Sequence, residues 1–193
     1  MAWASATISG VGRLFSRQQL IETLKACLLA LVLAATITDD ATAQTARLTQ
    51  PGAAPGQELA YALAVDGVRI AAGAAGEAQR TGAAYIYQCP GGICSAATRI
   101  APLDLASGDL FGSSLALSGD TLALSAPGQH PGAVYVYVWV GSTWAQQARI
   151  VPSGSGAGFG SALALQGDRL VVGADQADVR SGAVYVYARS AGA

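Results

Sequence analysis

Short apolar runs separated by glycine-rich turns fill the chain from residue 59 onwards, and their pattern repeats. The hexapeptide Gly-Ala-(Ala/Val)-Tyr-(Ile/Val)-Tyr begins at Gly82, Gly132 and Gly182, so that each start lies 50 residues after the one before. Side chains alternate between the two faces of a strand, so the tyrosines of each hexapeptide share one face and its aliphatic residues share the other. Apolar residues on both faces predict a strand that is covered on both sides, as in a sheet stacked between two other sheets.

Each repeat predicts four short strands. The first strand is an apolar run that begins at Phe111 or Phe159, and a two-residue Gly-Asp or Asp-Gly turn joins it to the second. The hexapeptide is the third strand, and Trp144–Ile150, matched by Cys94–Ile100 one repeat earlier, is the fourth. No segment after the first 43 residues has the hydrophobic period of a helix. The sequence therefore predicts an all-β fold of three four-stranded antiparallel β-propeller-type blades, a partial propeller, with repeats at 57–107, 108–157 and 158–193.

Three short motifs occur in phase within this repeat. Phe-Gly stands at Phe111-Gly112 and Phe159-Gly160, near-matches to Gly-Ala-Pro stand at Ser125-Ala126-Pro127 and Gly173-Ala174-Asp175, and the tyrosine hexapeptide follows. Together they resemble FG-GAP repeats, and the resemblance covers almost all of the chain after residue 43. It implies a relation to the seven-bladed propeller of integrin α-subunits and of many exported bacterial proteins, with binding or adhesion through the loops between strands. Because members of the family also accompany hydrolase domains, a third possibility is an accessory domain of an enzyme, although the sequence shows no catalytic domain.

The turn between the first two strands departs from the family pattern. Ion-binding members carry an Asp-x-Asp-x-Asp-Gly type of loop there, where a hard cation collects carboxylate oxygens. In this chain the turn is Ser118–Thr121 in one repeat and Gln166–Arg169 in the next, each with a single acid. We therefore expect no metal site and no cofactor. Asp104 and Asp109 share a loop but lack the spacing of a cation site, and we expect them to be solvated acids.

The number of strands also departs from a complete propeller. Ala46–Leu48 resembles Ala148–Ile150, so a fourth-strand segment precedes the first repeat, and the last repeat ends after Tyr187 without a fourth strand. Propellers usually have four to eight blades, and a stack of three leaves apolar faces open. We expect two chains to associate as a homo-oligomer that completes a propeller. A fragment of a longer ancestral propeller is the alternative.

Residues 1–43 have the features of a secretory signal peptide. Basic residues precede the apolar run Ala26–Ile37, and the small-residue triplet Ala41-Thr42-Ala43 follows it. The run falls short of the roughly 20 residues that span a membrane, which disfavours the alternative of a membrane anchor. We expect cleavage after Ala43 and a secreted or periplasmic protein that is not inserted in a membrane. The repeat domain is then 44–193.

Cys89 and Cys94 flank a short turn between the predicted third and fourth strands. One repeat later the same positions hold Trp139 and Trp144, and facing positions of a hairpin are close enough for an aromatic pair or a disulfide. Two cysteines in an exported domain favour a disulfide. A metal or redox pair is the alternative, but the spacing is not Cys-x-x-Cys and no histidine is near. The tryptophans are either a structural cross-strand pair or a stacking surface for a sugar or a partner.

Composition narrows the functional classes. The chain has 11 Lys and Arg against 12 Asp and Glu, and no basic cluster occurs after residue 25, which disfavours a nucleic-acid partner. His130 is the only histidine and no Gly-x-Ser-x-Gly motif is present, so we expect no catalytic residues and no enzyme. The Gly-rich run 154–160 leads into a predicted strand rather than a helix, which disfavours a phosphate-binding loop.

The loops between the second and third strands are the candidate binding segments. They are Ala75–Thr81, Gly128–Pro131 and Gln176–Ser181, and the repeat places them on one rim of the stacked sheets. The residues that we expect to contact a protein or glycan ligand are Gln129, His130, Gln176, Asp178 and Arg180. The favoured interpretation is an exported, non-enzymatic binding or adhesion module. A structural or degenerate fragment without a ligand of its own is the alternative.

Overall fold

The computed structural model describes residues 46–153 and 157–190. The predicted signal peptide, residues 1–43, lies outside these ranges and stays a prediction. Within the described ranges no helix has both the length and the hydropathy that crossing a membrane requires. The strands described below all belong to one structural unit that starts at Ala46.

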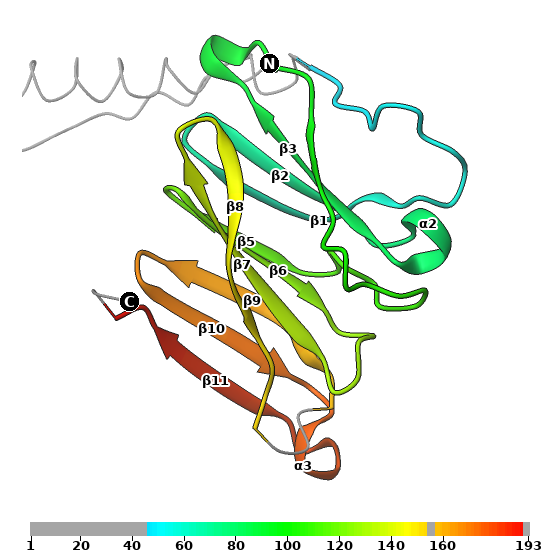
Figure 1. Cartoon of the computed structure of the whole chain (residues 1–193), viewed down its shortest axis with the longest axis vertical. Helices are drawn as coiled ribbons and strands as arrows, with labels where there is room; N and C mark the ends of the chain where they lie inside the picture. The colour runs from blue at the N-terminus through cyan, green and yellow to red at the C-terminus, as the bar shows by residue number, and fades with distance from the viewer. Residues whose placement is uncertain (1–45, 154–156, 191–193) are drawn as a thin grey trace, which may run out of the picture. The chain divides into compact units, whose positions relative to one another are not determined.

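Within these ranges, eleven strands form three antiparallel sheets, each built from consecutive strands of the chain (Figure 1). Sheet one has the order β1–β2–β3–β4, sheet two the order β5–β6–β7–β8, and sheet three the order β9–β10–β11. The strands are β1 Leu59–Asp66, β2 Arg69–Ala74, β3 Ala83–Gln88, β4 Thr98–Ile100, β5 Leu115–Ser118, β6 Thr121–Ala126, β7 Ala133–Val140, β8 Thr143–Ile150, β9 Phe159–Gln166, β10 Arg169–Ala174 and β11 Ala183–Ala188. The all-β prediction is confirmed. Within the described residues the third sheet has three strands, as expected from a last repeat that ends without a fourth strand.

A two-residue turn closes the first hairpin of each sheet, as predicted. Asp66 pairs with Arg69, Ser118 with Thr121 and Gln166 with Arg169, which leaves only two residues between the paired positions. The first residue of each turn is a glycine, with φ of 56°, 55° and 54° in chain order. Such a left-handed conformation costs little only at glycine, so the sequence fixes the register of all three hairpins.

The two apolar faces of each sheet follow from the alternation of side chains. The tyrosine face carries the hexapeptide tyrosines, and in sheet two it consists of Leu115, Leu117, Leu122, Leu124, Tyr135 and Tyr137. The valine face lies on the opposite side, and in sheet two it carries Ala123, Val134 and Val136. In sheets one and three the same names denote the faces with and without the hexapeptide tyrosines.

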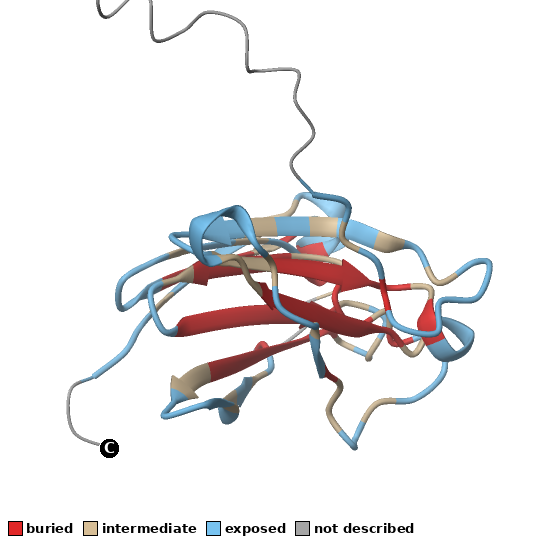
Figure 2. Ribbon diagram, turned by 90° about the horizontal axis from the view of Figure 1, so that it is seen from above, coloured by how far each residue is buried: buried red, intermediate tan, exposed pale blue. Residues whose placement is uncertain are grey.

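The sheets stack with a valine face against a tyrosine face. The valine face of sheet one, with Ala71, Ala84 and Ile86, belongs to one core cluster with the tyrosine face of sheet two. The valine face of sheet two forms a second cluster with Leu170 and Val172 on the tyrosine face of sheet three. Strands β6 and β7 are consequently buried over most of their length, whereas β1 and β11 are not, and Figure 2 shows buried strands lying between more exposed ones.

The Phe-Gly pairs pack sheets two and three closely against the sheet that precedes each of them. Phe111 and Phe159 are fully buried and meet Tyr135 and Tyr185 edge to face, with ring centroids 5.5 and 5.3 Å apart. Gly112 follows with φ of 86°, and a Cβ atom there would lie 2.5 Å from the carbonyl oxygen of Ala83 in sheet one. Glycine is therefore required both by the backbone conformation and by the close approach of the two sheets.

Three local expectations are wrong. Ala46–Leu48 forms no strand, and β4 covers only Thr98–Ile100 rather than Cys94–Ile100. The short 3-10 turn η1, Pro90–Gly92, and the disulfide end the hairpin early, since proline has no N–H to donate to a strand partner. The sequence predicts that the first strand of sheet two begins at Phe111, but Phe111 forms only an isolated parallel bridge to Gly82, and β5 begins at Leu115.

Gly112→Ala tests the close approach of sheets one and two. The added methyl group meets backbone atoms and the residue must keep a positive φ, so we expect the free energy of unfolding to fall by about 2–4 kcal/mol. Gly119→Ala is the matched control, because Gly119 also has a positive φ but has nothing within 4 Å of a Cβ. It should cost about 1–2 kcal/mol. Urea unfolding of both variants measures the difference, and equal losses would contradict the proposed clash.

Candidate functional site

The three loops between the second and third strands of each sheet lie on the same side of the stacked sheets (Figure 1). The loops after β2 and β10 each contain a single helical turn, α2 (Glu77–Arg80) and α3 (Ala177–Arg180). In α3 three successive residues, Asp178, Val179 and Arg180, have φ of 49°, 58° and 70°, and α2 repeats this conformation. The β6–β7 loop, Pro127–Gly132, is two residues shorter than the other two and has no such turn.

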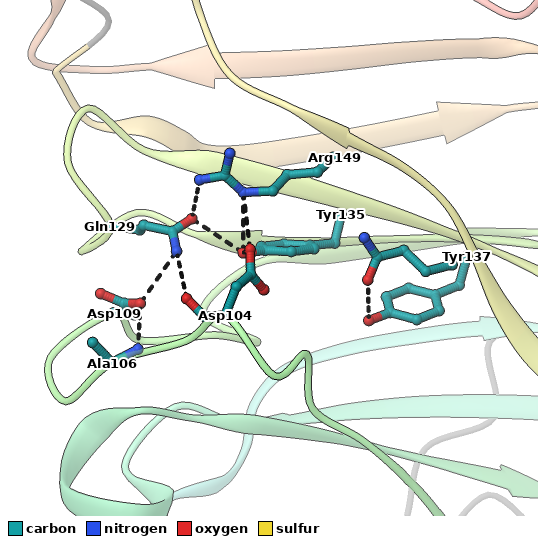
Figure 3. A network of polar contacts seen from close by, with 8 residues as sticks. Asp104, Ala106, Asp109, Gln129, Tyr135, Tyr137 and Arg149 are labelled. Carbon is teal, nitrogen blue, oxygen red and sulfur yellow. Dashed lines mark hydrogen bonds and ion pairs between the residues drawn. The ribbon is translucent and has the colours of Figure 1, made fainter.

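A polar network occupies this rim at sheet two (Figure 3). The Tyr135 hydroxyl lies 2.9 Å from Asp104 Oδ2 and 3.1 Å from Gln129 Oε1, and its single proton serves one of them at a time. Arg149 on β8 donates from Nε to the Tyr135 oxygen at 3.2 Å and from Nη2 to Gln129 Oε1 at 2.7 Å. Arg149 also pairs with Asp104 at 3.3 Å. The network joins a loop that follows β4 of sheet one to two strands of sheet two.

Asp109 differs from the predicted solvated acid. Its carboxylate is buried, accepts the Ala106 amide at 2.7 Å and lies 3.4 Å from Gln129 Nε2 (Figure 3). Asp104 is half exposed but paired with Arg149. The difference arises because stacking places the 104–109 loop of one repeat beneath Gln129 and Arg149 of the next.

Sheet one has an equivalent network around a buried carboxylate. Glu77 in α2 accepts hydrogen bonds from Gln50 at 2.8 Å, from Tyr85 at 2.7 Å and from Arg99 on β4 at 2.7 Å. Arg99 occupies the place in sheet one that Arg149 occupies in sheet two, since each pairs with the first hexapeptide tyrosine across its sheet. The residues of these two networks are engaged with one another and therefore form the framework of the rim.

Burial controls the protonation of the tyrosines in this framework. Burial, followed by the hydrogen bond and charge of Glu77, raises the pKa of Tyr85 from 10.0 to about 12. Burial also raises the pKa of Tyr137, whose hydroxyl donates to Gln146, and that of Tyr135. These hydroxyls remain neutral hydrogen-bond donors throughout the physiological range.

The rim at sheet three carries no such network among the described residues. Ala177 stands at the position of Glu77, and no fourth strand supplies an arginine beside Tyr185. A cavity of about 450 Å³ lies between the β6–β7 loop, the start of β9 and the residues that follow β10. Its lining includes Tyr61, His130, Asp175 and Gln176.

The predicted binding residues occupy three different environments. His130 and Gln176 are exposed and both line the cavity, although 46 residues separate them in the chain. Gln129 is half-buried and its side chain is engaged in the network of sheet two. Asp178 and Arg180 are exposed on α3 outside the cavity lining.

Sequence reasoning missed Asp175 and Tyr61, which also line the cavity. Asp175 is the last residue of the near-match to Gly-Ala-Pro, a motif that predicts framework, and it is exposed and lines the cavity. Tyr61 lies in the first repeat, where Leu59-Ala60 replaces Phe-Gly and weakens the match. The only sequence signal for Tyr61 is that it is a tyrosine outside the three hexapeptides.

The single acids of the hairpin turns pair with arginines, and the Asp120 pair joins sheet two to sheet one. Asp120 pairs with Arg69 of sheet one at 2.7 Å, and Asp168 pairs with Arg189 after β11 at 3.8 Å. Arg69 also lies over the rings of Trp139 and Trp144, 5.2 and 5.7 Å from their centroids. Across residues 46–153 and 157–190, no three His, Cys, Asp or Glu side chains lie close enough together to hold a metal ion.

The hairpin tips bear out the predicted equivalence of cysteines and tryptophans. Cys89 and Cys94 form a disulfide with an S–S distance of 2.05 Å. Trp139 pairs directly with Trp144 across β7 and β8, with ring centroids 5.4 Å apart. The backbone N–H of Cys89 donates to the carbonyl of Val68, as that of Trp139 donates to Asp120. Because Arg69 covers the tryptophan pair, we read the pair as structural.

Comparison with protein families agrees with this architecture. The FG-GAP repeat model matches the chain twice, over residues 95–137 and 144–187. The chain is an FG-GAP repeat protein. A search of curated proteins gave no significant match. Each matched FG-GAP repeat begins with the fourth strand of one sheet, β4 or β8, and continues with the first three strands of the next. The sequence repeats and the sheets are therefore out of phase by one strand.

Tyr85→Phe tests the tyrosine network of this FG-GAP protein. The folded protein holds the Tyr85 proton more tightly than the unfolded chain, so its contribution to stability is complete below pH 10.0 and is lost as the pH rises towards 12. The variant should lose about 1–3 kcal/mol at pH 7, because Glu77 then lacks a donor, and its stability should fall less between pH 10 and 12. Urea unfolding at several pH values measures both effects. Tyr61→Phe, at a mostly exposed tyrosine, is the control, and identical pH profiles of Tyr85→Phe and the parent chain would contradict the network.

Reduction tests the disulfide. The two cysteines are separated by five residues in the sequence, so the closed loop is short. We expect reductant to lower the free energy of unfolding by about 2 kcal/mol, at the low end for disulfides, without loss of the β-sheet circular dichroism. Urea unfolding with and without reductant measures the change, and two free thiols in non-reducing mass spectrometry of the purified chain would contradict the bridge.

Proposed function

We propose that this FG-GAP repeat protein is an exported, non-enzymatic binding module that takes a protein or glycan ligand at the rim cavity. The observation that carries the proposal is the cavity of about 450 Å³ between the loops of successive repeats. Its lining side chains His130, Asp175 and Gln176 are exposed and take no part in the framework networks.

The lining has the chemistry of a site for a polar, neutral ligand. The Asp175 carboxylate accepts hydrogen bonds, the Gln176 amide both donates and accepts, and His130 does the same in its neutral form. The mostly exposed ring of Tyr61 adds an apolar surface with a polar tip. This combination suits the hydroxyl groups and apolar faces of a sugar, or the side chains of a polar protein loop.

The arrangement of His130 supports a role without catalysis. A hydrolytic triad needs a histidine that is hydrogen-bonded to a carboxylate and to a nucleophile. Among the described residues, the His130 side chain forms no hydrogen bond or ion pair with either. The disulfide supports export, because disulfides form and persist outside the reducing cytoplasm. The hydropathy of residues 1–43 supports a signal peptide as the export route.

His130→Ala combined with Gln176→Ala tests the site. The purified chain is screened on an array of immobilised oligosaccharides and surface proteins, and each bound species is then titrated. We expect the double variant to lose affinity at least about tenfold, since two hydrogen-bonding groups are removed. Gln166→Ala is a matched control, because Gln166 is exposed at the far end of β9.

Three outcomes separate the alternatives. If the double variant Asp178→Ala with Arg180→Ala loses as much affinity for the ligand, the ligand binds at the α3 turn and the cavity proposal is wrong. Absence of any bound species on the array would favour a structural fragment without a ligand. Hydrolase activity of the purified chain would contradict a non-enzymatic role and favour a relation to enzyme-associated propellers.

A further inference from the structure

Two sheet faces have no partner within the described part of the chain. Sheet one exposes the β1 half of its tyrosine face, where Leu63 is 63% exposed, whereas Leu115 at the same position of sheet two is 7% exposed. Sheet three exposes its valine face, where Val184 is 71% exposed, whereas Val134 at the same position of sheet two is fully buried. Val65 and Val186 extend the two exposed patches.

One open face is a tyrosine face and the other is a valine face. Faces of these two kinds already pack against each other at two places inside the chain. Sheet one places a valine face on the tyrosine face of sheet two, and sheet two does the same to sheet three. A tyrosine face on sheet one and a valine face on sheet three remain. A second copy of the chain offers the complement of each, so the interface between copies would continue the stacking found inside the chain.

The segment Ala46–Gln50 lies where the fourth strand of a preceding sheet would lie. Leu48 packs on the tyrosine face of sheet one beside Tyr85 and Tyr87, as Ile100 of β4 packs on that of sheet two beside Tyr135 and Tyr137. The Tyr87 hydroxyl donates to the carbonyl of Thr49 at 3.2 Å. Arg47–Gln50 nevertheless belongs to none of the three sheets that the structure describes.

Gln50 repeats the polar link between successive sheets. Gln50 precedes sheet one and donates a hydrogen bond to Glu77 in the network of that sheet. In the same way Asp104, which follows β4 and precedes sheet two, accepts a hydrogen bond from Tyr135 in the network of sheet two. The FG-GAP repeats agree, since each begins with a fourth strand and the matching position one repeat earlier falls at the start of the described chain. The segment thus has the position of a fourth strand, although it forms none in the single chain.

Sheet three is the sheet without a fourth strand. Beside β11 lies a mostly apolar cavity of about 230 Å³, lined by Ala148 and Ile150 of β8 and by Tyr187. Ile150 is only half-buried there, whereas Ile100 at the same position of sheet one is buried. The open edge of β11 and this cavity provide the place for one more strand.

We propose that two copies of the chain associate head to tail, with the valine face of sheet three of one copy on the tyrosine face of sheet one of the other. Ala46–Gln50 of the second copy then pairs with β11 of the first as the fourth strand of its sheet three. Arg47, exposed in the single chain, takes the place beside the partner's Tyr185 that Arg149 takes beside Tyr135. Two such interfaces close a dimer, whereas a rotation that does not close gives longer assemblies.

Charge substitution on each open face tests the association in the purified chain. Sedimentation velocity should give the mass of two chains at micromolar concentration. Leu63→Glu and Val184→Glu should each raise the dissociation constant at least about tenfold, because each places a carboxylate in an apolar interface. Leu103→Glu is the matched control, because Leu103 is fully exposed in a loop away from both faces.

Mixing the two face variants identifies the pairing. Leu63→Glu chains keep an intact valine face and Val184→Glu chains keep an intact tyrosine face, so an equimolar mixture should regain a dimer held by one interface. A face that pairs with itself gives a different pattern, in which one variant dissociates, the other does not, and mixing restores nothing. That pattern would overturn the head-to-tail arrangement, as would a chain that is monomeric at tens of micromolar, because something other than a second copy would then cover the faces.

Arg47→Ala provides a second variant that leaves both faces intact. Its circular dichroism and unfolding as a dilute monomer should match the parent chain, since Arg47 is exposed. Its dimer dissociation constant should rise several-fold, because the arginine contacts only the partner's Tyr185. An unchanged dissociation constant would overturn the pairing of Ala46–Gln50 with β11.

Discussion

The stacking of a valine face on a tyrosine face is the interaction on which the rest of this structure depends. Each sheet has two apolar faces, so each face needs a neighbour, and the repeat supplies one of complementary shape. The Phe-Gly pair makes the fit possible, because Phe111 fills the space beside Tyr135 and Gly112 lets the backbone of sheet two approach that of sheet one. Burial of these apolar residues supplies most of the stabilisation, and the hairpin turns set which residues face the core.

Burying tyrosines creates a second requirement, since their hydroxyls need hydrogen-bond partners. Sheets one and two meet it with an arginine from their own fourth strand and a polar residue from the segment before them. The resulting networks around Glu77 and Gln129 join neighbouring sheets at the rim. Sheet three lacks its fourth strand among the described residues, so its rim has no such network. The cavity with His130 and Asp175 lies elsewhere on the rim, beside β9 and the β6–β7 loop.

The proposed roles of the molecule divide between two kinds of surface. The rim exposes polar side chains over a rigid base, which suits recognition of a ligand. The two end faces expose apolar side chains in the same alternation that is buried inside, which suits association with a second copy. Because His130 and Gln176 lie on the rim whereas Leu63 and Val184 lie on the end faces, ligand binding and association can be altered separately by substitution.

The sequence by itself determined most of the strands, their hairpin turns, the disulfide of Cys89 with Cys94 and the pairing of Trp139 with Trp144. These features depend on side-chain alternation, on glycines with positive φ, and on residues close together in the chain. Only the tertiary structure decided that Asp109 is buried, that Gln129 belongs to the framework, and that Tyr61 and Asp175 share a cavity with His130. Those outcomes depend on which loop of one repeat comes to lie against the next, and stacking brings together residues from different repeats that no local pattern connects. The place of Ala46–Gln50 was decided in the same way, since a segment with the sequence of a strand forms one only when an open edge lies beside it.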